Sequence, residues 1–336
     1  MTSDPLGRAP RLRRVRVIFA GTPEVAIPSL WALVDSPHEV VAVLTRPDAR
    51  SGRGRTLLPS PVRAAAEELG LPVLTPTTLR DEAVRAEIAA LEPDVVAVVA
   101  YGQLVPQDLL DLPTHGWVNL HFSLLPAWRG AAPVQHALLA GDAVTGASTF
   151  VIEAGLDTGP VIGTMTETVG PEDTTGTLLT RLADAGAPLL VASLDGLEAG
   201  RVTPTPQPGE GVSHAPKVTV DDARVRWDQP GFAVDRRVRA CTPDPGAWTT
   251  FRGDRLRLGP LSRSTDRLPG ELPDLAPGEL AAGKAWVLVG AADGPVRLGE
   301  VTPVGKKPMA AADWARGVRI EPGERLGAMP GGDDRG

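Results

Sequence analysis

One stretch of sequence indicates the class of fold: DVVAVVA, at residues 94–100. After Asp94 it is a continuous apolar run, without the polar alternation of a strand that has one face in water. Such runs are typical of parallel strands that are buried on both faces. The sequence therefore predicts a parallel sheet, with other elements covering both of its faces at this point.

Strands and helices are predicted to alternate around this stretch. We expect strands at 16–20, 40–44, 72–74 and 117–121, with a β-like pair at 147–153 and 161–169. Apolar residues at helical spacing predict helices from residue 23 to 33 and at 61–69, 81–91, 133–139 and 174–197. This alternation indicates an α/β fold with a mostly parallel sheet. Ligands bind beyond the carboxyl ends of such strands, so we expect chemistry after residue 100 and around His121.

The composition changes after residue 200. Residues 202–208 are rich in Pro and Thr and are interpreted as a linker. Short apolar runs follow, separated by turn residues, at 225–227, 248–251, 256–258, 285–289 and 295–298, and one helix is expected at 232–241. We predict a first domain over 14–203 and a small β domain over 210–328. We also expect a mobile loop at 262–277 and frayed ends at 1–14 and 328–336.

Length, charge and cysteine content narrow the class of protein. The chain has 336 residues, a net charge of −7 and one cysteine, Cys241. The length suggests two domains, and the charge excludes a globally basic nucleic-acid binder without excluding local basic patches. A single cysteine excludes an internal disulfide framework and favours a reducing, cytoplasmic setting. The longest apolar run, 95–101, is far shorter than the roughly 18 residues of a membrane span, so we expect no membrane contact.

The densest group of potentially chemical residues is NLHFSLLPAWRGAAP, at residues 119–133. Asn119 and His121 lie two residues apart on a predicted strand, so both point to the same face near its carboxyl end. Such a pair can donate hydrogen bonds to a developing oxyanion, and histidine can move a proton near neutral pH. Taken alone, the pair is also explained by a histidine that is satisfied by backbone groups.

A second group is EAGLDTGP, at residues 153–160, where glycines bracket Asp157 in a loop between two β runs. The carboxylate could fold back toward His121, to orient the imidazole or to accept a proton. The alternative is an Asx turn that only caps the loop.

A third group is the basic segment 46–63, which holds five arginines and reads as a flexible loop after the second strand. It is interpreted as an arm that contacts nucleic-acid phosphates, or as a solvated loop. The chain has no Gly-x-Gly-x-x-Gly motif, and its five histidines lack the spacing of metal ligands. We therefore expect neither NAD nor a metal.

Taken together, these segments resemble the methionyl-tRNA formyltransferases, within the wider family of 10-formyltetrahydrofolate-dependent formyltransferases. The resembling segments are 18–23, 51–54, 59–62, 98–102, 119–133, 141–142, 155–159 and 305–309. The run SLLPAWRGAAP indicates the wider family, whereas the basic loop and the GKKPM segment narrow it to the tRNA enzymes. The chain departs from the family at 241–245 and 262–277, both in the second domain.

The resemblance implies a Rossmann-like formyltransferase domain followed by a small OB-like β-barrel domain. It implies that Asn119, His121 and Asp157 form the catalytic triad. By the same resemblance, folate binds at Ser123, Leu124, Leu125, Pro126, Tyr101, Gly102 and Leu104, and Arg53 lies in the loop that enters the acceptor arm of the tRNA. From their charge, Arg46, Arg55, Lys306 and Lys307 are further expected tRNA contacts.

The implied reaction transfers the formyl group of 10-formyltetrahydrofolate, the co-substrate, to the α-amino group of the methionyl moiety of initiator methionyl-tRNA. We expect a cytoplasmic monomer that serves translation initiation. The alternatives are formyl transfer to an amino sugar or to glycinamide ribonucleotide, hydrolysis of 10-formyltetrahydrofolate, and a non-catalytic RNA-binding module.

Overall fold

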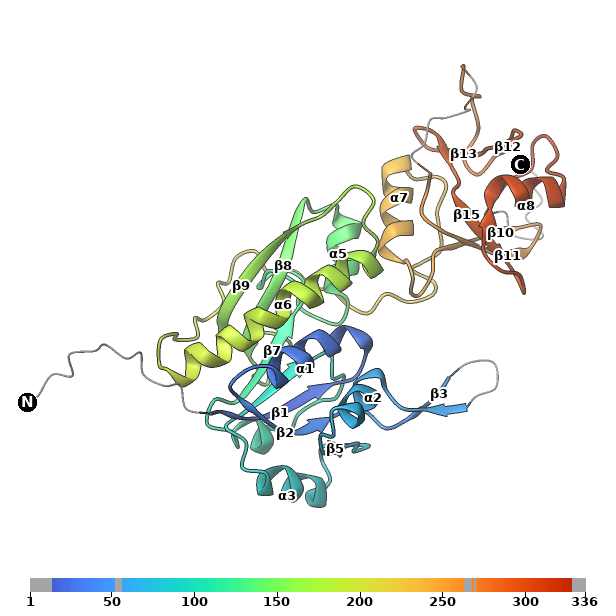
Figure 1. Ribbon diagram of the computed structural model, residues 1–336. Coiled ribbons are helices and arrows are strands. Elements are labelled where there is room, and N and C mark those ends of the chain that lie inside the picture. Colours follow the sequence, from blue (N-terminus) through green and yellow to red (C-terminus); the bar gives the residue numbers. More distant parts are fainter. Residues whose placement is uncertain (1–13, 52–55, 263–267, 269, 328–336) are drawn as a thin grey trace, which may run out of the picture. The chain divides into compact units, whose positions relative to one another are not determined.

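The computed structural model describes residues 14–51, 56–262, 268 and 270–327 (Figure 1). Arg53, Arg55, residues 1–13 and 328–336 of the expected frayed ends, and part of the expected loop at 262–277 lie outside these residues. The chain forms two compact units. The first comprises residues 1–130, 146–167 and 179–214, and the second comprises 131–145, 168–178 and 215–336. The domain boundaries predicted from the sequence stay predictions.

A seven-stranded sheet is the centre of the α/β part, with the order β5-β2-β1-β6-β7-β8-β9. The strands are β1 (Arg16–Gly21), β2 (Glu39–Leu44), β5 (Val73–Leu74), β6 (Val95–Val99), β7 (Trp117–His121), β8 (Val144–Val151) and β9 (Val161–Thr168). The pairs β1–β2, β1–β6, β2–β5 and β6–β7 are parallel, whereas β7–β8 is antiparallel. The prediction of a mostly parallel sheet is confirmed.

The stretch at 94–100 is the buried strand that its composition predicts. All five residues of β6 are buried, and β6 lies between β1 and β7. Val96 and Val98 pack in one cluster with Ile18 and Ala20 of β1. Because apolar side chains cover the sheet here, ligands have access only at the strand ends.

Helices lie between these strands in the chain, and a further helix follows the last strand. They are α1 (Ile27–Val34), preceded by the 3-10 turn η1 (Glu24–Ala26), then α2 (Pro61–Glu68), α3 (Glu82–Ala90) and α4 (Gln107–Leu110), with α6 (Thr175–Glu198) after β9. Ser60 caps α2, because its Oγ accepts a hydrogen bond from the Arg63 N–H at 3.0 Å. Asp81 caps α3 in the same way, accepting from the Ala83 N–H at 2.9 Å. The predicted helices are confirmed, whereas the four-residue α4 was not predicted.

One helix, α6, is long and apolar enough to cross a membrane by length and composition, among the residues that the structure describes. The sequence prediction considered only uninterrupted apolar runs and therefore overlooked it. Leu182, Leu190 and Leu194 of α6 are buried in the protein, with exposed fractions of 0–2%. A core helix passes the same test of length and composition, so this helix gives no evidence of a membrane.

The second unit contains two antiparallel sheets, β10-β11-β15-β16 and β12-β13-β14. Their strands are β10 (Trp248–Phe251), β11 (Asp254–Leu258), β12 (Leu280–Ala282), β13 (Val287–Ala291), β14 (Gly294–Arg297), β15 (Glu300–Pro303) and β16 (Met309–Ala310). The unit also holds α5 (Pro133–Ala140), α7 (Gly231–Ala240) and α8 (Ala311–Val318). The expectation of a small β domain is confirmed.

A single apolar core holds the β strands of the second unit together. The edge of the Phe251 ring meets Trp314 of α8, with the ring centroids 5.0 Å apart. Val289 and Val301 are fully buried in the same core. Cys241 lies there too, and burial raises the pKa of its thiol to about 11. Such a thiol stays protonated near neutral pH, so Cys241 is a packing residue.

The sequence analysis is wrong at three places. One helix was expected in the second domain, but α8 is a further helix there. The apolar run at 225–227, taken as part of the pattern of a β domain, forms no strand, because the chain makes only a single bridge between Arg224 and Trp248 before it turns. That turn buries Trp227, whose Nε1 donates to Thr249 Oγ1 at 3.1 Å. The basic segment after β2, expected to be a flexible loop, contains the antiparallel pair β3 (Ala49–Ser51) and β4 (Thr56–Leu58).

Core packing in the first unit predicts a contrast between two leucines. Leu33 of α1 is fully buried, and we expect Leu33→Ala to lower the free energy of unfolding by about 2–5 kcal/mol through the cavity that it leaves. Leu69 is 40% exposed, and Leu69→Ala is expected to change the free energy by less than about 0.5 kcal/mol. Unfolding by denaturant, monitored by circular dichroism, measures the free energy of unfolding of both variants. Equal losses for the two variants would contradict this description of the core.

Candidate active site

Strand β7 presents Asn119 and His121 at its carboxyl end. Asn119 pairs with Val98 of β6 on one side and with Phe150 of β8 on the other, and His121 pairs with Ser148 of β8. Directly opposed residues of an antiparallel pair share a face, so these side chains lie together. The Phe150 ring meets the His121 ring edge-on, with centroids 6.3 Å apart. The two predicted catalytic residues of β7 therefore share one face of the sheet.

The His121 ring is held by one hydrogen bond to the backbone. Nε2 lies 2.9 Å from the carbonyl oxygen of Trp128, in the loop that follows β7. A carbonyl oxygen can only accept, so Nε2 carries the proton. In the neutral ring the lone pair is then on Nδ1, which lies 3.8 Å from Asp157 Oδ2. The structure thus brings Asp157 to the proton-accepting nitrogen of His121.

Burial determines the charge of His121. The residue is only 6% exposed, and its removal from water lowers its pKa from the ordinary value of 6.5. The nearby charge of Asp157 and the bond to Trp128 oppose this effect without cancelling it. His121 is therefore neutral near pH 7, in the form that can accept a proton.

Asp157 is oriented by groups outside its own loop. Its Oδ2 accepts a hydrogen bond from the Gly130 N–H at 2.7 Å, 27 residues away along the chain. Its backbone adopts φ = 50°, a left-handed conformation that aspartate tolerates better than most residues. The carboxylate therefore folds back toward the segment that follows β7, as one of the two sequence interpretations expected.

The predicted folate segment after β7 is a tightly bonded loop. Ser123 Oγ donates to the Ala127 carbonyl at 2.6 Å, and the Ser123 carbonyl accepts from Ser148 Oγ at 2.7 Å. The Leu125 N–H in turn donates to Ser148 Oγ at 3.1 Å, and the Leu125–Pro126 peptide is cis. The Ser123 side chain is buried, and its hydroxyl is hydrogen-bonded inside the loop. A ligand would therefore contact the backbone and the surface of this segment rather than the Ser123 hydroxyl.

The three predicted folate residues after β6 differ in exposure. The Tyr101 side chain is 2% exposed and packs in the core with Leu79 and Leu109. Its hydroxyl has no hydrogen-bond partner among the residues that the structure describes, and burial raises its pKa above the ordinary value. Gly102 has φ = 80°, and Leu104 is 86% exposed. Only Gly102 and Leu104 thus face solvent beyond the strand end.

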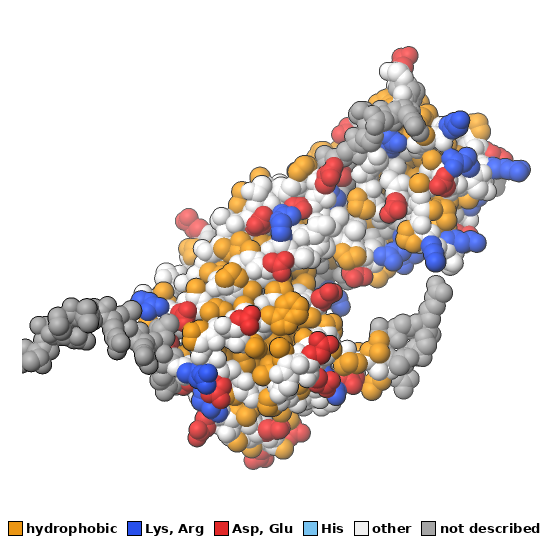
Figure 2. All heavy atoms as spheres, in the orientation of Figure 1, with side chains coloured by type: hydrophobic (Ala, Val, Ile, Leu, Met, Phe, Trp, Pro, Cys, Tyr) orange, Lys and Arg blue, Asp and Glu red, His pale blue; other side chains and the backbone are white. Residues whose placement is uncertain are grey.

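The predicted tRNA-binding residues are distributed over both units. Arg46 follows β2 and lies beside Gly102, where an added Cβ would be 3.8 Å from Arg46 Cδ. Lys306 and Lys307 are exposed in the turn between β15 and β16 of the second unit. Figure 2 shows Lys and Arg side chains on the visible surface of that unit. Another arginine of the basic segment, Arg63, is instead bound to Asp48 and Glu67, at 2.9 and 2.8 Å.

The sequence analysis missed one polar residue beside the triad, Gln207. It lies in the segment interpreted as a linker, yet its Nε2 donates to the carbonyl oxygens of Asp157 and Gly159, both at 2.8 Å. A single glutamine in a segment rich in Pro and Thr carries no periodic signal, so the sequence offered no means of finding it.

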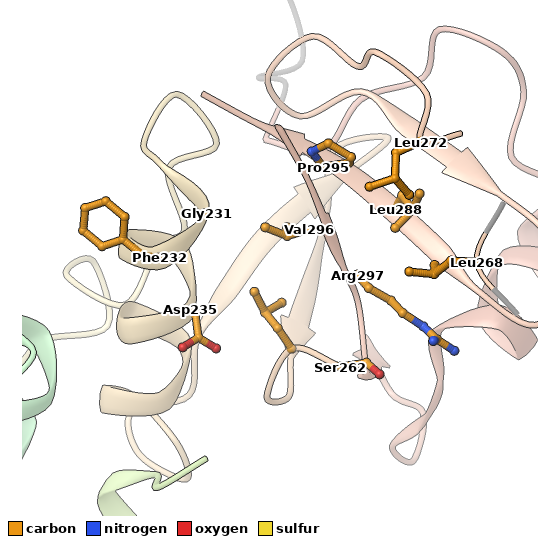
Figure 3. A pocket seen from close by; sticks show the side chains of 11 residues that line it. Gly231, Phe232, Asp235, Ser262, Leu268, Leu272, Leu288, Pro295, Val296 and Arg297 are labelled. Atoms are coloured by element: carbon orange, nitrogen blue, oxygen red, sulfur yellow. The ribbon is translucent and has the colours of Figure 1, made fainter. Parts of the chain in front are cut away.

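A pocket of about 360 Å³ lies in the second unit, between α7 and β14 (Figure 3). Apolar side chains dominate its lining, among them Phe232, Leu288 and Val296. None of the predicted catalytic, folate or tRNA residues lines it, so the strand ends of the first unit remain the candidate active site.

Comparison with known proteins identifies the family. Residues 13–194 match the family model described as formyl transferase, and residues 217–319 match the formyl transferase C-terminal domain. The chain is 62% identical over 312 residues to the methionyl-tRNA formyltransferase of Salinispora arenicola, covering 93% of this chain and 100% of that protein. The resemblance inferred from the sequence is confirmed, and so is the prediction of a formyl-transferring enzyme.

Two solved structures share the fold at low sequence identity. HypX from Aquifex aeolicus in complex with tetrahydrofolic acid is 19% identical, with a TM-score of 0.62 over 90% of this chain and 47% of that chain. The methionyl-tRNA formyltransferase from Clostridium thermocellum is 15% identical, with a TM-score of 0.55 over 76% of this chain and 97% of that chain. The fold agrees with the sequence match, and the chain belongs to the family of methionyl-tRNA formyltransferases.

Proposed function

We propose that the chain transfers the formyl group of 10-formyltetrahydrofolate to the α-amino group of the methionyl moiety of initiator tRNA. The observation that carries this proposal is the position of His121 Nδ1, 3.8 Å from Asp157 Oδ2 at the carboxyl end of β7, on the strand that also presents Asn119. The relative from Salinispora arenicola is named for this tRNA substrate, and the HypX structure holds tetrahydrofolic acid.

In the first step the amine nitrogen attacks the formyl carbon, and a tetrahedral intermediate with an oxyanion forms. Asn119 supplies a donor to that oxyanion. Its side chain makes no hydrogen bond to another residue in the described part of the chain, so its amide N–H groups are available. Such a donor stabilises the charge that develops in the transition state, and its loss typically costs about 100- to 1,000-fold in rate.

His121 moves the proton. Nδ1 accepts it from the attacking amine nitrogen, and the Asp157 carboxylate stabilises the resulting imidazolium. His121 then returns the proton to N10 as the bond between the formyl carbon and N10 breaks, which releases tetrahydrofolate and the formylated amine. Because Nε2–H is bound to the Trp128 carbonyl, His121 donates to the oxyanion only through Nδ1–H, after it has taken the proton.

The folate co-substrate binds along the backbone of the segment at 123–126 and beside Gly102 and Leu104. The tRNA binds through basic side chains, namely Arg46, Arg53, Arg55, Lys306 and Lys307. The mechanism uses no metal and no NAD. The matched Salinispora arenicola protein is bacterial. We propose that this chain works in the cytoplasm, as a monomer, in translation initiation.

An assay of formyl transfer to charged methionyl-tRNA, with free methionine as the comparison, tests the function. Transfer to the charged tRNA alone is expected. Release of formate without transfer would indicate a hydrolase, and tRNA binding with neither reaction would indicate a binding module. Transfer to an amino sugar would point to a different amine substrate.

The same assay tests the two residues of β7. Asn119→Ala and His121→Ala are each expected to lower kcat by about 100- to 1,000-fold, because each removes a group that acts in the transition state. Folate binding, measured by calorimetry, is expected to persist in both variants. His136→Ala is the control, because His136 lies on α5 in the second unit. Near-normal turnover in either β7 variant would contradict the assigned roles.

Removal of the Asp157 charge is expected to lower the pKa of His121 further, because that charge opposes the effect of burial. In Asp157→Asn, the acid limb of the kcat profile therefore moves to lower pH while the maximal rate falls. NMR titration of the His121 ring measures the pKa directly. Asp111→Asn removes a comparable charge from an exposed position and is expected to leave the titration unchanged. A higher His121 pKa in Asp157→Asn would refute this electrostatic account.

The double variant Lys306→Ala/Lys307→Ala is expected to raise KM for the tRNA and to flatten its dependence on salt, since two phosphate contacts are lost. KM for the folate should stay constant. Lys284→Ala, also an exposed lysine of the second unit, is the matched control. An equal rise of both KM values would show that these lysines do not act on the tRNA.

A further inference from the structure

The segment interpreted as a linker reaches the catalytic loop and binds it. We propose that Gln207 is a positioning residue that holds Asp157 in place against His121. This inference rests on the proposed function, because it assumes that Asp157 acts on His121 during formyl transfer. All the residues involved lie within the first unit.

The Gln207 amide is bonded on both of its sides. Nε2 donates to the carbonyl oxygens of Asp157 and Gly159, each at 2.8 Å. Oε1 accepts from Arg129 twice, from Nε at 3.0 Å and from Nη2 at 2.6 Å. Two carbonyl oxygens require a donor and the guanidinium requires an acceptor, so only a side-chain amide satisfies both. Glutamate lacks the donors, and lysine lacks the acceptor.

The loop that carries Asp157 has little packing to hold it. Residues 153–156 are exposed, and Leu156 is 64% exposed. Asp157 adopts φ = 50°, which costs free energy in a residue other than glycine unless surrounding contacts impose it. A Cβ at Gly159 would collide with the Val151 carbonyl oxygen, so the loop backbone passes close to the end of β8 at this residue. Hydrogen bonds from Gln207 fix both residues of this turn at once.

The partner of Gln207, Arg129, belongs to the segment that holds His121. Its neighbour Trp128 accepts the His121 Nε2–H, and the next residue, Gly130, donates to Asp157. Gln207 therefore joins the Arg129 side chain, from the loop that orients the histidine, to the backbone that presents the carboxylate. Such a bridge sets the distance between the two catalytic groups.

Residues on either side of Gln207 secure the segment itself. Thr205 pairs with Val161 through two backbone hydrogen bonds of 2.8 Å, at the end of the Asp157 loop. Ser213 accepts from the Trp128 and Arg129 N–H groups, each at 2.9 Å. Gln207 is thus held between two anchored points, and its amide has a fixed position from which to act.

The test compares Gln207→Leu with Gln107→Leu. The first variant keeps a side chain of similar size and removes all four hydrogen bonds of the amide. The control removes an exposed hydrogen bond from Gln107 of α4 to Asp111, the residue that follows this helix. We expect Gln207→Leu to lower kcat by up to about 100-fold while KM for folate and for tRNA changes little, because misplacement acts on the chemical step. Gln107→Leu should match the unmodified enzyme.

A second readout separates positioning from a merely structural role. If Asp157 moves away from His121, the pKa of His121 falls, and NMR titration of the ring detects this. Gln207→Glu keeps an acceptor for Arg129 but has no donor for the loop carbonyls, so it is expected to lower kcat as Gln207→Leu does. An unchanged kcat or an unchanged His121 titration in Gln207→Leu would overturn the inference.

A double-mutant cycle tells this inference apart from the proposed function. In the Asp157→Asn background, Gln207→Leu is expected to cause a much smaller further loss than it does alone, because both changes act through one carboxylate. Full additivity would show that Gln207 acts elsewhere. If Asp157→Asn alone retained full activity, the proposed role of Asp157 would fail, and the inference with it. If Asp157→Asn is impaired but Gln207→Leu is not, only the inference fails.

Discussion

One hydrogen bond, from His121 Nε2–H to the Trp128 carbonyl, determines what the site can do. It assigns the proton to Nε2 and leaves the lone pair on Nδ1, the nitrogen that faces Asp157. It also ties the orientation of the ring to the backbone of the loop after β7. The Trp128 backbone has φ = 60°, and its N–H is held by Ser213. The chemistry of the histidine therefore depends on a loop whose conformation other segments impose.

Two opposing effects act on the pKa of His121: burial lowers it, and the charge of the Asp157 carboxylate raises it. Burial alone would make His121 a weak base, and Asp157 restores part of its basicity from 3.8 Å. A direct hydrogen bond would make a tighter ion pair, but Nδ1 carries no proton in the neutral ring, because the proton is on Nε2. The carboxylate thus supports a charge on His121 when the proton arrives, without holding the ring charged beforehand.

The regular parts of the fold could be predicted from sequence because their signals are local. Apolar runs and 3.6-residue periodicity located the strands and helices of the sheet, including β6, β7 and α6. The second unit was harder, because β12, β15 and β16 have only two to four residues each and acquire their pairing from distant partners. The prediction for the apolar run at 225–227 was wrong for the same reason. The course of the chain there depends on the burial of Trp227, whose Nε1 bonds to Thr249.

The sequence by itself determined that Asn119 and His121 share a face at a strand end, because side-chain alternation is a property of neighbouring residues. It also supplied the family, through a continuous motif. The tertiary structure alone decided that Asp157 reaches Gly130, that Gln207 binds a loop 50 residues earlier, and that Tyr101 turns into the core. These contacts join groups far apart in the chain. Their geometry depends on how whole helices and strands pack, and a local sequence pattern does not predict that packing.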